Sequence, residues 1–172
     1  MTIKVDPYDK ESIKRAIKAV KQYKKDLEQK TAQLVRAMVQ EGLINARDIV
    51  PIDTGVARSS ITGYVDESTG TGIIRAGGYC SFIEFGTGPV GMTSPHPSPE
   101  YMEIMGWAYD VGATIFTRRD GERGWYYPTK DGGWAWTSGM PSRPFMFETA
   151  EYLAQEYKRI AREIFSGQGS VQ

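Results

Sequence analysis

A long run of helical periodicity at the start of the chain constrains the fold more than any other feature. Within residues 9–49, apolar side chains recur at intervals of three, four or seven, the spacing of one face of an α-helix. The apolar positions are Ile13, Ile17, Val20, Leu27, Leu34 and Met38, with Lys24 and Thr31 in the intervening slots. Asp9 or Ser12 can cap the helix at its start. The pattern therefore predicts one amphipathic helix of about 40 residues.

A helix of this length is longer than a globule of this size. At 1.5 Å per residue it would be about 60 Å long, whereas a globule of this size is about 40 Å across. The helix must therefore break, for which the Lys24-Lys25 stretch and Gly42 are the weakest points, or project. A projecting helix with an apolar stripe needs a neighbouring subunit to cover it, so the pattern is a first indication of oligomerisation.

Composition narrows the class of protein. The 172 residues fit a single domain spanning 1–172, and equal numbers of Lys plus Arg and Asp plus Glu, 21 each, give no overall field toward nucleic acid or membrane. The single cysteine, Cys80, lies among apolar residues, which favours a packed thiol in a reducing compartment. No apolar run approaches the roughly 18 residues of a membrane span. We expect a soluble, cytoplasmic protein.

The remaining elements complete an α+β pattern. Residues 57–65, 72–76 and 79–85 are predicted to form three strands of a small antiparallel meander, separated by Gly, Asp and Ser-rich turns. The stretches 86–91 and 93–99 are too rich in glycine or proline for regular structure and are expected to form a loop.

The C-terminal part of the chain completes the pattern. A short helix is predicted within 101–109, and an aromatic hairpin at 125–128 and 134–136 with an Asp-Gly turn. A helix with regular apolar spacing from Phe147 to Ile164 ends the ordered chain, and a flexible tail is expected over 167–172.

The triplet Asp53-Thr54-Gly55 admits two interpretations. It is the catalytic triplet of aspartic proteases, which would need a second carboxylate close by, from a second lobe or from dimer symmetry, and strands on both sides. It is also a good turn: Pro51 stops the helix, Asp53 can accept backbone hydrogen bonds, and Gly55 tolerates a positive φ. The helical periodicity before the triplet favours the turn.

Other candidate sites carry weaker signals. His96 lies alone in the proline-rich loop without further metal ligands at suitable spacing, so we expect a solvated histidine. The glycine-rich triplets beginning at Gly70 and Gly86 do not open helices and carry no following lysine, which argues against nucleotide binding.

One basic face of the first helix could follow DNA phosphates, although the interspersed acidic residues favour a solvated surface. This face consists of Lys14, Lys18, Lys21 and Lys25. The four tryptophans, all between residues 107 and 136, can form either core packing or a docking surface.

Taken in order, several short blocks resemble a known family. A long N-terminal helix is followed by Pro-Ile-Asp-Thr-Gly and Arg-Ser-Ser-Ile within 51–61, by Tyr…Glu-Phe-Gly-Thr within 79–87, and by Arg-Pro-Phe at 143–145. This arrangement resembles the gene-ten-like family of tailed-bacteriophage tail components, named after a lambdoid phage of the HK group. The resemblance covers residues 9–165, with 88–139 as a loop and hairpin insertion. The structural signature consists of Pro51, Asp53, Thr54, Gly55, Arg58, Ser60, Ile61, Tyr79, Glu84, Phe85, Gly86, Thr87, Arg143, Pro144 and Phe145.

The resemblance implies an assembly function without catalysis, cofactor or metal. It implies a homo-hexameric ring in the neck of the virion, made in the host cytoplasm, that contacts head-closure or connector proteins, tail tube or terminator proteins, and passively the DNA passing through. Residues 84–87 and the loop that follows are our candidates for contacts between subunits or to the next ring, because a Gly- and Pro-rich loop can order on assembly. The candidate assembly loop contains Gly88, Thr93, Pro95, His96, Pro97 and Pro99. The alternatives are an aspartic protease using Asp53 and a DNA-binding module using the basic helix face.

Overall fold

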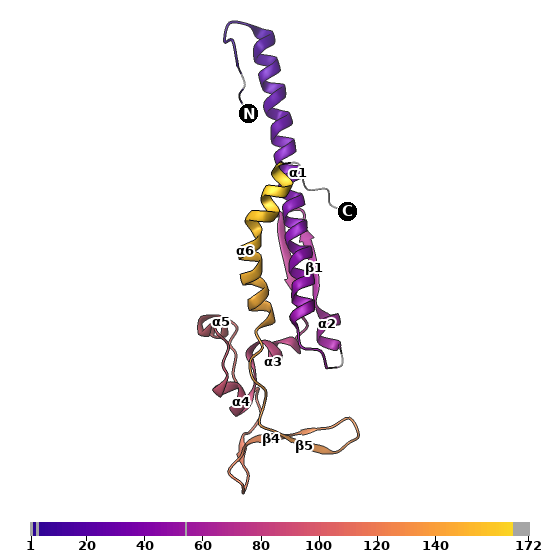
Figure 1. Ribbon diagram of the computed structural model, residues 1–172, viewed down its shortest axis with the longest axis vertical. Coiled ribbons are helices and arrows are strands. Elements are labelled where there is room, and N and C mark those ends of the chain that lie inside the picture. Colours follow the sequence, from indigo (N-terminus) through magenta and orange to yellow (C-terminus); the bar gives the residue numbers. More distant parts are fainter. Residues whose placement is uncertain (1, 3, 54, 167–172) are drawn as a thin grey trace.

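A computed structural model describes residues 2, 4–53 and 55–166 as an elongated α+β fold (Figure 1). A long N-terminal helix, two small antiparallel sheets and a long C-terminal helix form the architecture, so the predicted fold class is confirmed. The elements in order are α1 (Lys10–Ile49), α2 (Val56–Ser60), β1 (Thr62–Asp66), β2 (Thr71–Arg75), α3 (Cys80–Phe85), α4 (Gly88–Thr93), α5 (Pro99–Ile104), β3 (Phe116–Thr117), β4 (Arg123–Pro128), β5 (Trp134–Thr137) and α6 (Phe145–Ser166).

The first helix projects instead of breaking. The Asp9 side chain caps α1 by accepting a hydrogen bond from the Glu11 amide, and the helix continues without interruption to Ile49. α6 runs antiparallel to α1 along the C-terminal half of α1. It ends beside Lys30, whose Nζ donates to the Phe165 carbonyl oxygen at 2.9 Å. The 20 residues of α1 before Lys30 therefore extend about 30 Å past the end of α6, as the indigo helix in Figure 1 shows.

Glycine lets two elements approach α1 closely. A Cβ at Gly72 of β2 would lie 2.5 Å from Val39 Cγ2, so the β1–β2 hairpin packs directly on the helix backbone. A Cβ at Gly42 of α1 would lie 2.5 Å from Ile74 Cδ1 and 2.7 Å from Leu153 Cδ1. Gly42 is therefore not a break in the helix. It is the place where β2 and α6 meet over α1, which offsets its low helix propensity.

The hydrophobic core lies at the C-terminal end of α1. It joins this end to α2, α3 and the first turn of α6, and its fully buried members include Ile61 and Ala46. The other buried members of the cluster are Val50, Ala57, Cys80, Ile83 and Phe145. The prediction of a packed Cys80 thiol is thus confirmed, with Cys80 Sγ 3.3 Å from Ser60 Oγ.

Two of the predicted strands are wrong in whole or in part. Residues 57–65 divide into α2 and β1, because Gly55, at φ 78°, turns the chain into a short helix before the strand begins. Residues 80–85 form α3 instead of a strand, and the buried positions Cys80, Ile83 and Glu84 have helical spacing. The three-stranded meander is therefore a two-stranded hairpin, β1–β2.

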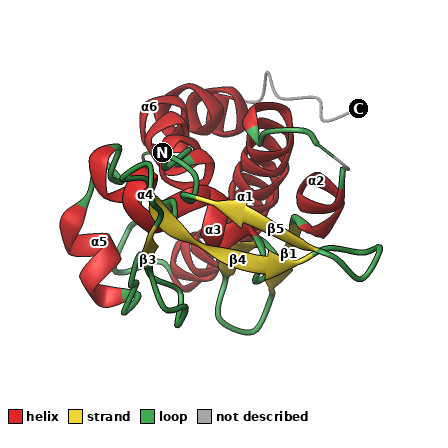
Figure 2. Ribbon diagram, turned by 90° about the horizontal axis from the view of Figure 1, so that it is seen from below, coloured by secondary structure: helices red, strands yellow, loops and turns green. Residues whose placement is uncertain are grey.

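The segment between α3 and α6 forms a subdomain at the opposite end from the projecting helix. The predicted loop at 86–91 is partly helical, because Pro89 occupies the first turn of α4. The predicted short helix is α5, capped by Ser98, and the predicted hairpin is β4–β5, with Gly132 at φ 83° in its turn and β3 added beside β4. Figure 2 shows these strands in one sheet below the helices.

The two ends of this segment lie side by side. A Cβ at Gly139 would be 2.9 Å from the Cα of Gly88, and the amide and carbonyl of Thr87 exchange hydrogen bonds with Met140. An insertion at one point of a smaller fold requires such an arrangement. The tail predicted over 167–172 lies outside the described residues. Within the described ranges, none of the helices is both long enough and apolar enough to cross a bilayer.

The turn after α1 yields the first prediction. Gly55 has φ 78° with open space around it, so Gly55→Ala should destabilise the protein by about 1–2 kcal/mol through backbone strain alone. Asp53 is exposed, and Asp53→Asn should leave the unfolding midpoint unchanged. Urea unfolding of both variants followed by circular dichroism measures the difference. A larger loss for Asp53→Asn than for Gly55→Ala would contradict the turn interpretation.

Candidate functional site

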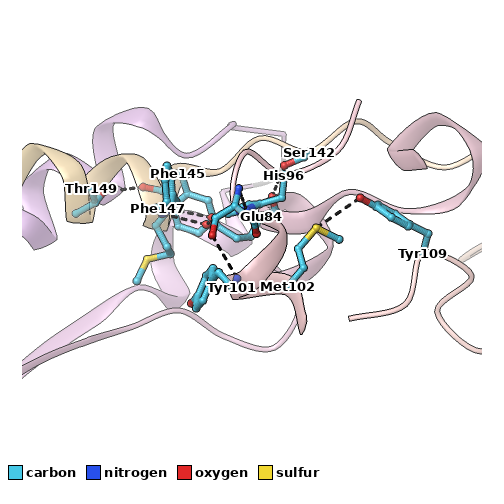
Figure 3. A network of polar contacts seen from close by, with 11 residues as sticks. Glu84, His96, Tyr101, Met102, Tyr109, Ser142, Phe145, Phe147 and Thr149 are labelled. Atoms are coloured by element: carbon cyan, nitrogen blue, oxygen red, sulfur yellow. Dashed lines mark hydrogen bonds and ion pairs between the residues drawn. The ribbon is translucent and has the colours of Figure 1, made fainter. Parts of the chain in front are cut away.

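A buried carboxylate joins α3 to the start of α6. Glu84 is only 3% exposed, and its two carboxylate oxygens accept hydrogen bonds from the first turn of α6. The Met146 amide donates to Oε2 at 2.9 Å and the Phe147 amide donates to Oε1 at 3.0 Å (Figure 3). These amides have no partner within the helix, and the positive end of the helix dipole favours a carboxylate there. Glu84 therefore caps α6 from another element.

His96 completes this arrangement. It is 2% exposed, with Nε2 3.3 Å from Glu84 Oε1. Both the amide and the carbonyl oxygen of Ser98 lie near His96 Nδ1, at 3.0 Å and 3.2 Å. Because Nε2 faces a carboxylate, which accepts hydrogen bonds, Nε2 carries a proton and donates to Glu84. The ring packs against Phe85 and Phe147, with centroids 5.2 Å away in each case. The prediction of a solvated loop histidine was therefore wrong, because the proline-rich segment folds back over Glu84.

Tyr101 of α5 covers the same cluster. Its ring lies 5.4 Å from that of Phe85 and 5.7 Å from that of His96. Burial, followed by the negative charge of Glu84, raises the pKa of the Tyr101 hydroxyl above its ordinary value of 10.0. The cluster is thus a buried carboxylate surrounded by aromatic rings. The oxygens of Glu84 accept hydrogen bonds from two backbone amides and face the His96 ring.

The glycine after α3 fixes the chain that leads into α6. Gly86 has φ 75°, and a Cβ there would lie 2.6 Å from the Ser142 amide nitrogen, so no other residue fits without displacement. The Arg143 amide donates to the Ile83 carbonyl at 2.8 Å, and Trp107 Nε1 donates to the Gly86 carbonyl at 3.0 Å. Two of the signature blocks, 79–87 and 143–145, therefore hold each other in place.

The third block packs on the same junction from the side of α1. Ile61 is fully buried in the core, Arg58 pairs with Asp48 at 3.0 Å, and Ser60 contacts Cys80. Asp53 is exposed between α1 and α2, whereas the protease hypothesis requires strands on both sides of it. Thr54 lies outside the described residues.

An open pocket of about 610 Å³ lies where these blocks meet. Apolar and aromatic side chains line most of it, and Asp53, Lys130 and Arg143 contribute charges of both signs. The other lining residues are Pro51, Gly55, Val56, Ala57, Tyr79, Ile83, Tyr127, Met140 and Pro141. The pocket brings the 51–57 turn to the tip of the β4–β5 hairpin.

The candidate assembly residues are divided between surface and interior. Residues 84–87 are buried within the single chain, so their side chains stabilise the junction and are not available for contact with another subunit. Gly88 and His96 are buried as well, whereas Thr93, Pro95, Pro97 and Pro99 are exposed. We therefore no longer assign contacts between subunits to residues 84–87.

The projecting half of α1 exposes the apolar stripe expected from the sequence. Ile13 is 37% exposed, Ile17 51%, Val20 55% and Leu27 43%. The basic residues Lys14, Lys18, Lys21 and Lys25 are also exposed on this half. The projecting half therefore combines exposed aliphatic side chains at helical spacing with exposed lysines.

A groove that the sequence did not predict lies between β2 and α6, with α1 as its floor. Its volume is about 470 Å³ and its lining is almost entirely apolar. The lining residues are Leu34, Val35, Met38, Val39, Gly72, Ile74, Met146, Thr149, Ala150, Leu153 and Tyr157. The helical spacing of 146, 149, 150, 153 and 157 was the available signal, but spacing does not show that one edge of that stripe stays uncovered.

Comparisons with protein-family models, curated proteins and solved structures find no match to this chain. Within the described residues, no group of three or more His, Cys, Asp or Glu side chains is placed to hold a metal ion. The geometry of the chain itself, a capped junction, an open pocket, an apolar groove and a projecting helix, is therefore the basis for inferring its function.

The Glu84 cap gives a second prediction. Glu84→Ala should lower the free energy of unfolding by about 3–5 kcal/mol, because two helix amides and the His96 donor lose a buried partner. Glu84→Gln keeps one acceptor oxygen and should lose less, and Glu100→Ala on the exposed face of α5 is the control. Chemical denaturation measures all three. A loss below about 1 kcal/mol for Glu84→Ala would contradict the capping role.

The Tyr101 hydroxyl gives a third prediction, on alkaline stability. Because its pKa is raised in the folded protein, its contribution is fully present below pH 10 and is lost as pH rises through the folded-state pKa. The free energy of unfolding should therefore fall above pH 10, and Tyr101→Phe should make this fall shallower. Denaturation midpoints between pH 8 and pH 11 provide the measurement. Parallel curves for the two proteins would show that Tyr101 does not contribute.

Proposed function

We propose that the chain is a structural virion-assembly protein of a tailed phage or prophage, a tail-completion or head–tail connector component that acts as an oligomeric ring in the neck. The observation that carries the proposal is the projecting half of α1. About 30 Å of helix with exposed aliphatic side chains extends past the end of α6 (Figure 1). A chain with such a helix is suited to be a subunit of an oligomer, in which a neighbour covers the stripe.

Helix energetics support this reading. An isolated helix of about 20 residues is marginal in water, and most helical stability in proteins comes from packing of the apolar face. Residues 10–29 obtain little of that packing within the chain, since Ile17 and Val20 are more than half exposed. A neighbouring subunit supplies it in an oligomer. Interfaces that repeat by a fixed rotation close into rings, which suits a neck component.

The two ends of the molecule suit a ring with two different faces. The projecting helix forms one end and the β4–β5 hairpin the other (Figure 1). The hairpin exposes three aromatic side chains, Trp134, Tyr126 and Tyr127, of which Trp134 is 70% exposed. Exposed aromatic residues of this kind are enriched at protein contacts. We assign this end to the head-closure, connector or tail proteins that adjoin the ring.

The signature blocks support the same proposal through their positions. All three converge on one junction, where Glu84 caps α6, Gly86 permits close approach and Ile61 fills the core. Residues that fix the angle between two long helices set the shape of a subunit. A subunit that acts by geometry depends on that shape more than on any reactive group.

Disruption of the gene tests the proposal. In the phage or prophage that carries it, loss of the protein should give DNA-filled heads and separate tails that do not join, seen by electron microscopy. Adding purified wild-type protein to that lysate should restore infectious particles. Asp53→Asn protein should restore them equally, whereas an aspartic protease would require the carboxylate. Normal tailed particles in the absence of the protein would contradict the proposal.

A further inference from the structure

We propose that the exposed stripe of the projecting α1 half packs into the groove between α6 and β2 of a second copy of this chain. The inference rests on the proposed function in one respect, that the chain acts as an oligomer. It adds the two surfaces that make the contact. The groove is almost entirely apolar, the stripe is apolar apart from Lys24, and no described residue covers either surface.

The groove can receive the side chains of a helix. Leu34 and Met38 of α1 form its floor, Leu153 and Tyr157 of α6 line one wall, and β2 forms the other. Leu153 and Ile74, one from each wall, both approach Gly42 of α1, where a Cβ would lie 2.7 Å and 2.5 Å from them. The stripe from Ile13 to Leu27 is about 21 Å long, and the α6 wall from Met146 to Tyr157 is about 17 Å long, so the two lengths match.

The stripe cannot occupy the groove of its own chain, because α1 is uninterrupted. The stripe and the floor of the groove lie on the same face of α1, because Leu34 and Met38 continue the spacing of Ile13, Ile17 and Val20. Since α1 is unbroken from Lys10 to Ile49, the stripe cannot fold back onto that floor. The stripe that enters the groove must belong to another molecule.

The distribution of charge favours contact of the stripe with the groove of a second copy over contact between two stripes. Residues 10–30 hold eight Lys or Arg and three Asp or Glu, a net charge of +5. Because the whole chain holds 21 of each, the remaining residues hold 13 and 18, a net charge of −5. Two projecting helices side by side would repel each other, whereas a projecting helix against the body of a second copy is attracted.

Three variants separate the two surfaces. The double variant Ile17→Gln, Val20→Gln removes apolar contact from the stripe without changing the charge or the helix propensity much. Ala150→Arg places a long charged side chain in the groove from an exposed position on α6. The control Ala154→Arg makes the same change one turn further along α6, at an exposed position outside the groove lining.

Sedimentation equilibrium of the full chain up to about 1 mM measures association. The wild-type protein and Ala154→Arg should form species above the 19.2 kDa monomer. The stripe variant and Ala150→Arg should each dissociate about 100-fold more readily. An equimolar mixture of those two should form a heterodimer, because one keeps an intact groove and the other an intact stripe. Added salt should weaken the wild-type association.

The outcomes are distinct. A wild-type protein that stays monomeric, or an Ala150→Arg protein that associates like the wild type, overturns the inference. A mixture that stays monomeric also overturns it. A wild-type mass of two copies with the expected variant behaviour keeps the inference, through two reciprocal contacts, but counts against a ring. A larger closed species supports both proposals.

Discussion

The contact between the Glu84 carboxylate and the first turn of α6 positions the rest of the structure. Glu84 is presented by α3, which packs on the end of α1, and it holds the Met146 and Phe147 amides that begin α6. A buried carboxylate is costly unless its oxygens are satisfied, and here helix amides and the His96 ring satisfy them. The cap fixes the point at which α6 begins, and α6 then forms one wall of the groove.

The fold leaves its assembly surfaces on one continuous face of α1. The C-terminal half of that face is flanked by α6 and by the glycine-rich hairpin β1–β2, which together make a groove. In the described part of the chain, most of the N-terminal half stays exposed because α6 ends beside Lys30. The difference in length between two antiparallel helices, 40 residues against 22, therefore creates both the exposed stripe and the site that can accept it.

Two features of the sequence predicted the structure well, the periodicity of the first helix and a turn with specific residue requirements. The spacing of Ile13 to Met38 predicted α1, and the Asp-Gly turn predicted the β4–β5 hairpin. Most of the strand predicted at 79–85 is the helix α3, because seven residues are too few for apolar periodicity to distinguish a strand from a helix. His96 was misjudged for a different reason. Its partner Glu84 comes close only because the chain folds back after α4, and the residues next to His96 in the sequence do not indicate this contact.

Amide hydrogen exchange measured over a range of protein concentrations tests the account most directly. The account predicts that amides of residues 10–30 exchange quickly in dilute solution, where the helix is bare, and become protected as concentration rises. The groove wall on α6, residues 146–157, should gain protection over the same range of concentration. Rapid exchange in residues 10–30 at every concentration, or protection there without any change in the groove, would contradict the claim that the projecting helix is completed by the groove of another subunit.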